Sequence, residues 1–258
     1  MNNLLKTFQD KDKKVLSIYF SAGYPELEDT HRIMLALQKG GADLIEVGIP
    51  FSDPVADGPT IQESNKIALN NGITLKKILA QLNEIKEEIR IPVILMGYLN
   101  PIYQYGIENF CKDCQKSGVS GLIIPDLPVK EYQNEYKSVF EKHRLANIFL
   151  ITPQTSEERI REIDKISNSF IYMVSSSSTT GAKKGLTQDQ IDYFIRIQNM
   201  QLKSPLLIGF GISDHQSFTL VTTYANGAII GSAFINVLKN SNNLEEDIVA
   251  YVRSVKGN

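Results

Sequence analysis

The chain has 258 residues, of which 42% are hydrophobic and 22% charged, and its formal net charge is −2. This composition is ordinary for a globular protein and offers no basic stripe of the kind that binds nucleic acid. The N-terminal segment lacks the apolar run of a signal peptide, and no apolar stretch is long enough to span a membrane. We therefore expect a cytoplasmic protein without a nucleic-acid or membrane partner.

Apolar runs rich in β-branched residues alternate with segments of helical spacing along nearly the whole chain. A short amphipathic helix is expected first, at Asn3–Gln9. The predicted strands are Val15–Ser21, Asp43–Ile49, Pro92–Tyr98, Gly121–Pro125, Asn147–Thr152, Phe170–Ser175, Pro205–Gly209 and Gly227–Gly231. The predicted helices are Asp29–Lys39, Ile61–Asn70, Thr74–Ile89, Ile107–Ser117, Val129–His143, Ser156–Ile166, Gln188–Asn199, Asp214–Tyr224 and a C-terminal helix interrupted near Asn240–Asn243.

These eight strand-then-helix units predict a parallel sheet, because strict alternation of strands and helices is typical of α/β folds. An open doubly wound sheet would usually have fewer strands or an added domain, and no linker-like change in composition marks a second domain. The sequence therefore predicts one (β/α)8 TIM barrel over residues 1–258, with the extra helix at its N-terminus.

The second predicted strand carries a carboxylate. Side chains alternate across a strand, so Leu44, Glu46 and Gly48 share one face. Burying an unpaired carboxylate is costly, so Glu46 is either paired with a lysine or arginine or used in catalysis. Asp57 follows eleven residues later, in a loop rich in Pro, Gly and Asp. The two carboxylates are a candidate acid/base pair.

The active site of such a barrel lies at the C-terminal ends of its strands, so polar residues at the remaining strand ends are also candidates for chemistry. Tyr98 and Asn100 follow the third strand, Asp126 follows the fourth, and Tyr172 lies within the sixth. These positions supply polar groups but no cluster with metal-ligand spacing, so no metal site is expected.

Glycines mark the last two strand ends. The segment Gly209–Ser213 follows the seventh strand, and Gly231 with Ser232 precedes the helix after the eighth. Backbone N–H groups at such loops and helix starts bind anions, which predicts a phosphate site with Gly181 as a third contributor. The segment Ser175–Gly185 is expected to be a mobile lid, the alternative being a connection without a role.

The histidines and cysteines are assigned no chemistry. His31, His143 and His215 fall in or beside predicted helices and are expected at the surface, which leaves carboxylates as the proton-transfer groups. Cys111 and Cys114 have the C-x-x-C spacing of a redox pair or half of a zinc site, but no further ligand set completes one. We interpret them as ordinary residues of a helix.

Several motifs occur together in one order along the chain. The run LIEVGIPFSDPVADGPTIQ over residues 44–62 resembles the signature of the tryptophan synthase alpha chain family. SAGYP, MGYLNPIYQYG, PDLPVKE, GFGIS and GSA extend the resemblance over nearly the whole chain. The resemblance implies a lyase that splits indole-3-glycerol phosphate into indole and glyceraldehyde 3-phosphate by reverse aldol cleavage.

The resemblance also implies roles for single residues. Glu46 would be the general acid/base, and Asp57 would accept the indole N–H. The implied substrate-binding residues, which line the indole pocket or hold the phosphate, are Tyr19, Ile123, Leu150, Tyr172, Thr180, Gly181, Phe210, Gly211, Gly231 and Ser232. The implied contacts with a partner beta chain are Asp53, Pro54, Asn100, Asp126 and Pro128.

The same resemblance implies that indole passes to the beta chain for condensation with L-serine to L-tryptophan. It also implies that the two chains form an alpha2-beta2 heterotetramer. The chain itself would need no cofactor, since pyridoxal phosphate belongs to the beta chain. The alternatives left open are a stand-alone indole-releasing lyase, a catalytically silent barrel that activates the beta chain, and an isomerase or epimerase acting on a ribose phosphate.

Overall fold

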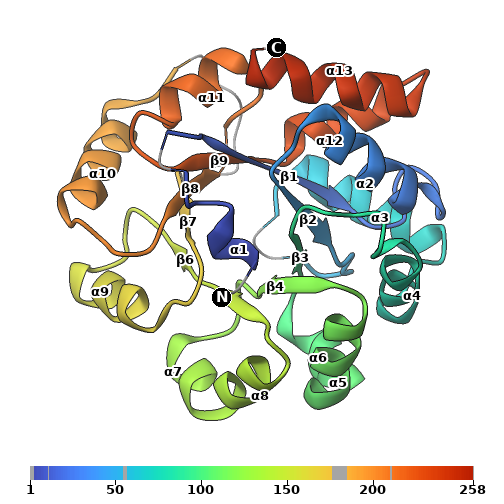
Figure 1. The fold of residues 1–258 in the computed structure, drawn as a ribbon, viewed down its shortest axis with the longest axis horizontal. Helices are drawn as coiled ribbons and strands as arrows, with labels where there is room; N and C mark the ends of the chain where they lie inside the picture. The colour runs from blue at the N-terminus through green and yellow to red at the C-terminus, as the bar shows by residue number, and fades with distance from the viewer. Residues whose placement is uncertain (1–2, 11, 55–56, 176–184, 210, 258) are drawn as a thin grey trace.

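The structure, a computed structural model, describes residues 3–10, 12–54, 57–175, 185–209 and 211–257. Its described strands form a ring enclosed by helices (Figure 1). The strands are β1 (Val15–Ser21), β2 (Leu44–Gly48), β3 (Val93–Met96), β4 (Val119–Ile123), β5 (Ala146–Ile148), β6 (Leu150–Ile151), β7 (Ile171–Val174), β8 (Leu206–Gly209) and β9 (Gly227–Ile230).

The strands pair in the order β5-β4-β3-β2-β1-β9-β8-β7-β6, and every pair is parallel. The two ends of this order, β5 and β6, are separated in sequence by Phe149 alone, whose carbonyl accepts a hydrogen bond of 2.9 Å from the Tyr172 N–H. One stretch of chain therefore closes the ring, and the predicted TIM barrel is confirmed.

The predicted fifth strand, Asn147–Thr152, is divided into β5 and β6. Its first part pairs with β4 and its second part with β7. Strands of a barrel are tilted and staggered, so a strand can meet its two neighbours at different heights. The division at Phe149 follows from this stagger, and no separate ninth unit is present among the described residues.

The helices, apart from the N-terminal α1, cover the outside of the ring (Figure 1). They are α1 (Asn3–Lys6), α2 (Asp29–Gly40), α3 (Pro59–Asn70), α4 (Leu75–Ile85), α5 (Leu99–Tyr105), α6 (Ile107–Lys116), α7 (Val129–Glu131), α8 (Lys137–Lys142), α9 (Glu157–Ile166), α10 (Gln188–Asn199), α11 (His215–Val221), α12 (Ser232–Lys239) and α13 (Leu244–Lys256). A π-helical turn over Tyr132–Tyr136 joins α7 to α8. The predicted break near Asn240–Asn243 lies between α12 and α13.

Helix α5 is an element that the sequence analysis did not predict. Pro101 lies in its first turn, where proline is tolerated because the N–H it lacks would have no partner within the helix. The Leu99 N–H at the start of the helix donates to both carboxylate oxygens of Asp126, at 2.9 and 3.2 Å. The cap thus comes from the loop after β4, which local sequence patterns do not show.

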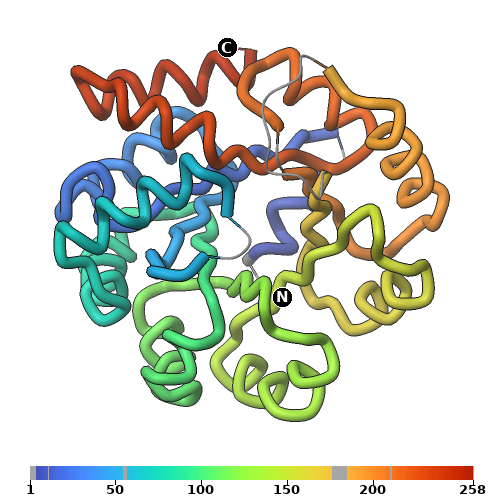
Figure 2. The backbone as a smooth tube through the Cα atoms, turned by 180° about the vertical axis from the view of Figure 1, so that it is seen from behind, coloured from blue at the N-terminus to red at the C-terminus, as the bar shows by residue number. Residues whose placement is uncertain are grey.

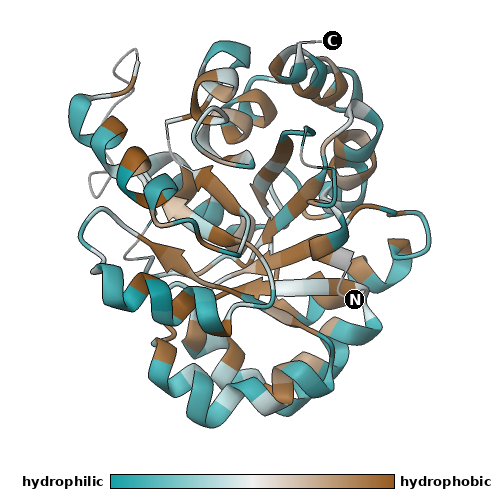
Figure 3. Ribbon diagram, turned by 60° about the vertical axis from the view of Figure 1, so that its left-hand side comes forward, coloured by the Kyte–Doolittle hydropathy of each residue, from teal (hydrophilic) through white to brown (hydrophobic). Residues whose placement is uncertain are grey.

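Two apolar layers follow from the alternation of side chains along the strands. One lies between the strands and the helices, and Figure 3 shows hydrophobic strands surrounded by helices of mixed character. The other fills the inside of the ring; its buried members are Leu4, Val15, Leu44, Ile94, Ile123, Ala146, Ile148, Phe170, Tyr172, Leu207 and Ile229. Glu46 lies on the same face of β2 as Leu44, so it points into the ring.

The N-terminal helix closes one end of the ring. Leu4 of α1 is fully buried within the inner cluster, and Phe8 packs its ring 5.8 Å from that of Phe170. Figures 1 and 2 both show α1 inside the circle of strands, seen from opposite sides. The predicted N-terminal helix is therefore present, although it ends at Lys6 rather than Gln9.

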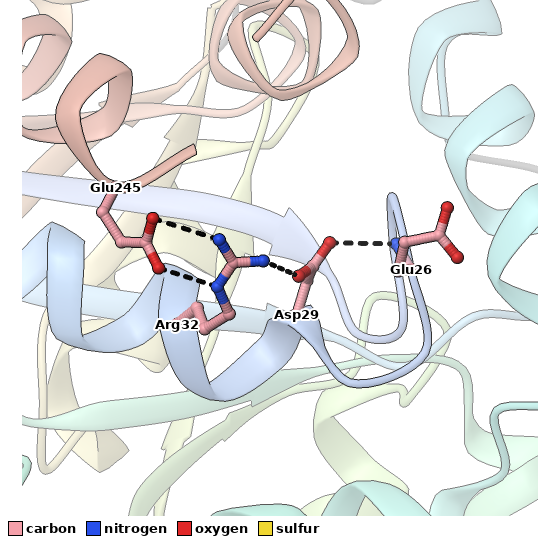
Figure 4. A network of polar contacts seen from close by, with 4 residues as sticks. All are labelled: Glu26, Asp29, Arg32 and Glu245. Atoms are coloured by element: carbon pink, nitrogen blue, oxygen red, sulfur yellow. Dashed lines mark hydrogen bonds and ion pairs between the residues drawn. The ribbon is translucent and has the colours of Figure 1, made fainter. Parts of the chain in front are cut away.

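The C-terminal helix α13 is attached to the barrel at two places. At the surface, Arg32 donates to both Glu245 oxygens, at 2.7 and 3.1 Å, and to Asp29 at 2.8 Å (Figure 4). At the second place, Asp43, which directly precedes β2, forms ion pairs with Lys256 at 2.8 Å and with Lys13 at 2.6 Å. Asp43 also accepts a hydrogen bond of 2.9 Å from the Leu16 N–H, so its carboxylate joins three segments of the chain.

We expect the two attachments to differ in their contribution to stability. Asp43→Asn removes a carboxylate whose side chain is 5% exposed and should lower the free energy of unfolding by roughly 2 to 4 kcal/mol. Arg32→Ala breaks an exposed network and should cost less than about 1 kcal/mol. Urea denaturation of both variants measures the difference, and equal losses would contradict this account of the buried attachment.

Candidate functional site

Glu46 is the most deeply buried carboxylate among the described residues, with no exposed surface. The Ser17 hydroxyl of β1 donates to its Oε1 at 2.6 Å, whereas its Oε2 has no hydrogen-bond partner among the described residues. Burial raises the pKa of Glu46 to about 7, and the hydrogen bond from Ser17 only partly opposes this shift. Both protonation states of Glu46 are therefore populated near neutral pH.

Asp57 lies in the loop between β2 and α3 and is half-buried. Its backbone carbonyl accepts from the Gln62 amide at 2.8 Å, while its Oδ2 faces the Tyr98 hydroxyl at 3.5 Å. Burial raises the pKa of Asp57 to about 6, although the contact with Tyr98 lowers it somewhat. The loop thus presents a second carboxylate whose charged form is disfavoured.

Two tyrosines belong to the same group. Tyr19 of β1 is paired in register with Glu46, and Tyr172 lies on the inner face of β7. Burial, together with the negative charges of Glu46 and Asp57, raises the pKa of both phenols, so both remain protonated. The charges of both carboxylates act on both tyrosines, so the four side chains lie in the same region of the barrel.

Glycines make room for these tyrosines. A Cβ atom on Gly48 would lie 2.2 Å from the Tyr19 hydroxyl oxygen, and one on Gly209 would lie 2.1 Å from that of Tyr172. Such distances are far inside van der Waals contact, so each tyrosine occupies space that only glycine leaves free. Glycine at positions 48 and 209 therefore leaves the space that the two hydroxyl groups occupy.

The apolar residues predicted for the substrate pocket lie near this group. Ile123 and Tyr172 are members of the inner cluster, and Leu150 packs against it. Phe210 lies outside the described residues. The inner face thus combines apolar walls with the buried carboxylate of Glu46, as a pocket for an aromatic ring requires.

The predicted phosphate residues are at the ends of β8 and β9. Gly211 has a φ of +78°, and no described atom lies within 4 Å of where its Cβ would be. Gly231 precedes α12 without a side-chain cap, and Ser232, the first residue of that helix, is exposed. The helix start thus offers free N–H groups. Thr180, Gly181 and most of the predicted lid, residues 176–184, lie outside the described residues.

The predicted partner contacts follow three neighbouring strands: Asp53 and Pro54 come after β2, Asn100 lies in α5 after β3, and Asp126 and Pro128 come after β4. Asp53, Asn100, Asp126 and Pro128 are exposed, and Pro54 is half-buried. Because Asp126 caps α5, the loop after β4 is tied to the segment that follows β3. The structure therefore presents these predicted contacts at the surface, and their use by a partner stays a prediction.

The expectation that all three histidines lie at the surface is wrong for His143. It is buried, with its ring nitrogens 3.0 Å from Gln115 Oε1 and 3.0 Å from Glu108 Oε1, because the end of α8 packs against α6. Cys114 of α6 is buried with Cys111, and burial raises the pKa of the Cys111 thiol to about 12.

No metal or membrane-spanning element is found in the part of the chain that the structure describes. No three His, Cys, Asp or Glu side chains there come together in a way that could hold a metal ion. No helix there has the length and apolar character needed to cross a membrane.

Ser17 is a residue of the candidate site that the sequence analysis did not identify. Side chains alternate along β1, so Ser17 lies on the same face as Tyr19, and this alternation could have placed it inside the barrel. Its contact with Glu46, however, depends on the pairing of β1 with β2, in which Ser17 lies opposite Leu44. The register, rather than any local motif, brings the hydroxyl to the carboxylate.

The fold is that of a (β/α)8 barrel, and its candidate site contains two carboxylates, Glu46 and Asp57, whose pKa values are raised by burial. A family model described as "Tryptophan synthase alpha chain" matches residues 5–257. The alpha chain of Flavobacterium psychrophilum is 59% identical over 238 residues, covering 92% of this chain and 94% of the relative, and that of Christiangramia forsetii is 54% identical over 256 residues, covering 99% of each. This chain belongs to the tryptophan synthase alpha chain family.

A solved structure supports the same conclusion. The crystal structure of the tryptophan synthase alpha chain from Legionella pneumophila has a TM-score of 0.89 and 34% sequence identity, covering 100% of this chain and 97% of that chain. The predicted family, barrel fold and alpha-subunit lyase function are confirmed. The chain is thus a lyase of tryptophan biosynthesis.

The raised pKa of Glu46 predicts a pH dependence of stability. Folding raises this pKa from 4.5 to about 7, so stability present at low pH is lost as pH rises through that range. Glu46→Gln removes the titration, and the variant should gain roughly 2 kcal/mol in free energy of unfolding relative to the unmodified protein between pH 5 and pH 8. Urea denaturation at several pH values measures this gain.

Glu87→Gln is the matched control, because Glu87 is exposed. It should show no comparable gain over the same pH range. A Glu46→Gln variant whose stability ran parallel to that of the unmodified protein from pH 5 to pH 8 would refute the raised pKa.

Proposed function

We propose that indole-3-glycerol phosphate is cleaved to indole and glyceraldehyde 3-phosphate at the end of the barrel where Glu46 and Asp57 converge. The observation that carries this proposal is the unpartnered Oε2 of Glu46, a carboxylate oxygen with no exposed surface. Leaving a buried polar atom unpaired costs free energy, so its retention indicates a partner that arrives with substrate.

Glu46 would act first as an acid and then as a base. Its carboxyl proton moves to the indole ring carbon that bears the glycerol chain, giving a positively charged indolenine. The resulting carboxylate then takes the proton of the adjacent glycerol hydroxyl. The electron pair of the breaking carbon–carbon bond returns to the ring, and the hydroxyl carbon becomes the aldehyde. A pKa of about 7 suits both steps.

Asp57 would accept the indole N–H and stabilise the positive charge that develops on the ring. Its half-buried position strengthens such an interaction relative to water. Because the protonated ring itself takes up electrons, the cleavage needs neither a Schiff base nor a metal. The apolar walls contributed by Ile123 and Leu150 would hold the flat ring between the two carboxylates.

The phosphate would bind at the ends of β8 and β9, where Gly211, Gly231 and Ser232 offer backbone N–H groups. The uncapped start of α12 adds the positive end of a helix dipole. This arrangement separates the two ends of the substrate, since the anion is held by one half of the barrel and proton transfer occurs in the other.

The activity implies a beta chain that receives indole and condenses it with L-serine. Family membership implies such a partner, and we propose an alpha2-beta2 heterotetramer whose contacts with this chain include Asp53, Asn100 and Asp126. Alpha chains of the family have no cofactor of their own, and we assign pyridoxal phosphate to the beta chain. The cytoplasmic location also stays a prediction.

Glu46→Gln should abolish the cleavage while leaving the fold intact. The amide cannot donate and accept the proton in turn, so we expect indole release to fall roughly 10²- to 10⁴-fold. Indole formed from indole-3-glycerol phosphate, with the beta chain present, gives the rate, and circular dichroism checks the fold. Near-normal turnover would overturn the assignment.

Asp57→Asn should slow the reaction on the order of 10²-fold, because it removes a charge that acts mainly on the transition state. Binding of glycerol phosphate should be unchanged, since the phosphate site lies on other loops. Turnover and inhibition by glycerol phosphate distinguish these effects. An equal loss of both would show that Asp57 serves binding rather than charge stabilisation.

The functional proposal is tested by measuring indole release from indole-3-glycerol phosphate with and without a matching beta chain. Slow release that rises strongly with the beta chain is the expected result. Fast release that does not respond to the beta chain would indicate a stand-alone lyase. The absence of release in both conditions would indicate a silent barrel.

A further inference from the structure

The two oxygens of Glu46 have different surroundings. Oε1 accepts the hydrogen bond from Ser17 Oγ at 2.6 Å, and Oε2 has no partner among the described residues. Both residues have no exposed surface, so no bulk water competes with the contact. A hydrogen bond to a carboxylate at this distance is charge-assisted and short.

Ser17 is paired in register with an apolar residue on each neighbouring strand. It lies opposite Leu44 on one neighbouring strand and opposite Ile229 on the other, and both are fully or almost fully buried. Among the described residues, Glu46 is the side chain with which Ser17 hydrogen-bonds. A buried hydroxyl without a partner would be destabilising here, so the position of Ser17 makes sense only together with Glu46.

We propose that Ser17 is a positioning residue for the lyase reaction, which holds Oε1 of Glu46 so that Oε2 is the oxygen that exchanges protons with the substrate. This inference rests on the proposed role of Glu46 as acid and base. The hydroxyl can donate to Oε1 in both protonation states of Glu46. It therefore keeps the carboxyl proton on Oε2 and preserves the side-chain orientation through the whole cycle.

The other titratable groups near Glu46 do not duplicate this function. Tyr19 from β1, Tyr172 from β7 and Asp57 from the loop after β2 face the same region. Both tyrosines stay neutral. The pKa of Glu46 is set by burial, which raises it, and by the hydrogen bond from Ser17, which lowers it. The two tyrosines and Asp57 are not among the causes of this shift. Loss of the hydroxyl should thus raise that pKa further.

The test compares Ser17→Ala with Ser17→Thr, which keeps a hydroxyl. Ser120→Ala is the matched control, because Ser120 is a strand serine of β4 on the opposite face from Gly121. In Ser17→Ala we expect kcat with the beta chain to fall about 10-fold, a loss typical of one hydrogen bond to a charged group, with KM nearly unchanged. Ser17→Thr should retain most of the activity, and Ser120→Ala all of it.

A second measurement follows Glu46 directly. The infrared band of its carboxyl group, identified as the band missing from Glu46→Gln, should titrate about one pH unit higher in Ser17→Ala. A shifted titration with lowered kcat and rescue by threonine supports the proposal. An unshifted titration, or a shifted one with normal kcat, overturns it.

The infrared titration does not depend on catalysis, so the two proposals can fail separately. If Glu46→Gln kept normal turnover, the role of Glu46 itself would be wrong whatever Ser17 does. If Glu46→Gln were inactive while Ser17→Ala matched the unmodified enzyme, only the role of Ser17 would be wrong. Urea midpoints of all variants detect a general loss of stability, and a fall in kcat that threonine does not rescue would count against positioning.

Discussion

The candidate site of this barrel depends on the burial of one carboxylate, that of Glu46. Glu46 is enclosed by strands, and its only hydrogen-bond donor in the described structure is Ser17. An ion pair would remove the cost of burial, but it would also fix the charge and lower the pKa of Glu46. By offering a single neutral hydroxyl, the barrel keeps this pKa close to neutrality, which is where an acid that must also be a base works best.

Glycines shape the space around Glu46 as much as the larger side chains do. Tyr19 fills the place of a Gly48 side chain, and Tyr172 that of a Gly209 side chain. Both glycines are on the inner face of strands that flank the site, and each hydroxyl is thereby held within the barrel near the carboxylates. Burial keeps both phenols protonated, so neither adds a negative charge beside the carboxylates.

The strands were largely predictable because their signals are local. Asp43–Ile49 was expected and Leu44–Gly48 is observed, and its inward face followed from simple alternation. Features that depend on distant residues were missed. Helix α5 relies on a cap from Asp126, and Ser17 reaches Glu46 only through the register of β1 and β2. Local patterns carry no information about either contact.

The candidate site, too, could be predicted only where the signal is local. Glu46 and Asp57 could be named from the sequence, because a carboxylate on an otherwise apolar strand needs a partner or a use, and a second carboxylate follows in the next loop. Their pKa values depend on burial by the whole barrel, which the sequence does not give.

The contacts that stabilise the barrel lie away from the candidate site: α1 closes one end of the ring, and Asp43 joins β2 to Lys13 and Lys256. Since Asp43 precedes the strand that carries Glu46, the paired carboxylate anchors the start of β2 and the unpaired one faces the substrate end. Stability and reactivity are thus divided along a single strand, and a change at Asp43 need not alter the chemistry of Glu46.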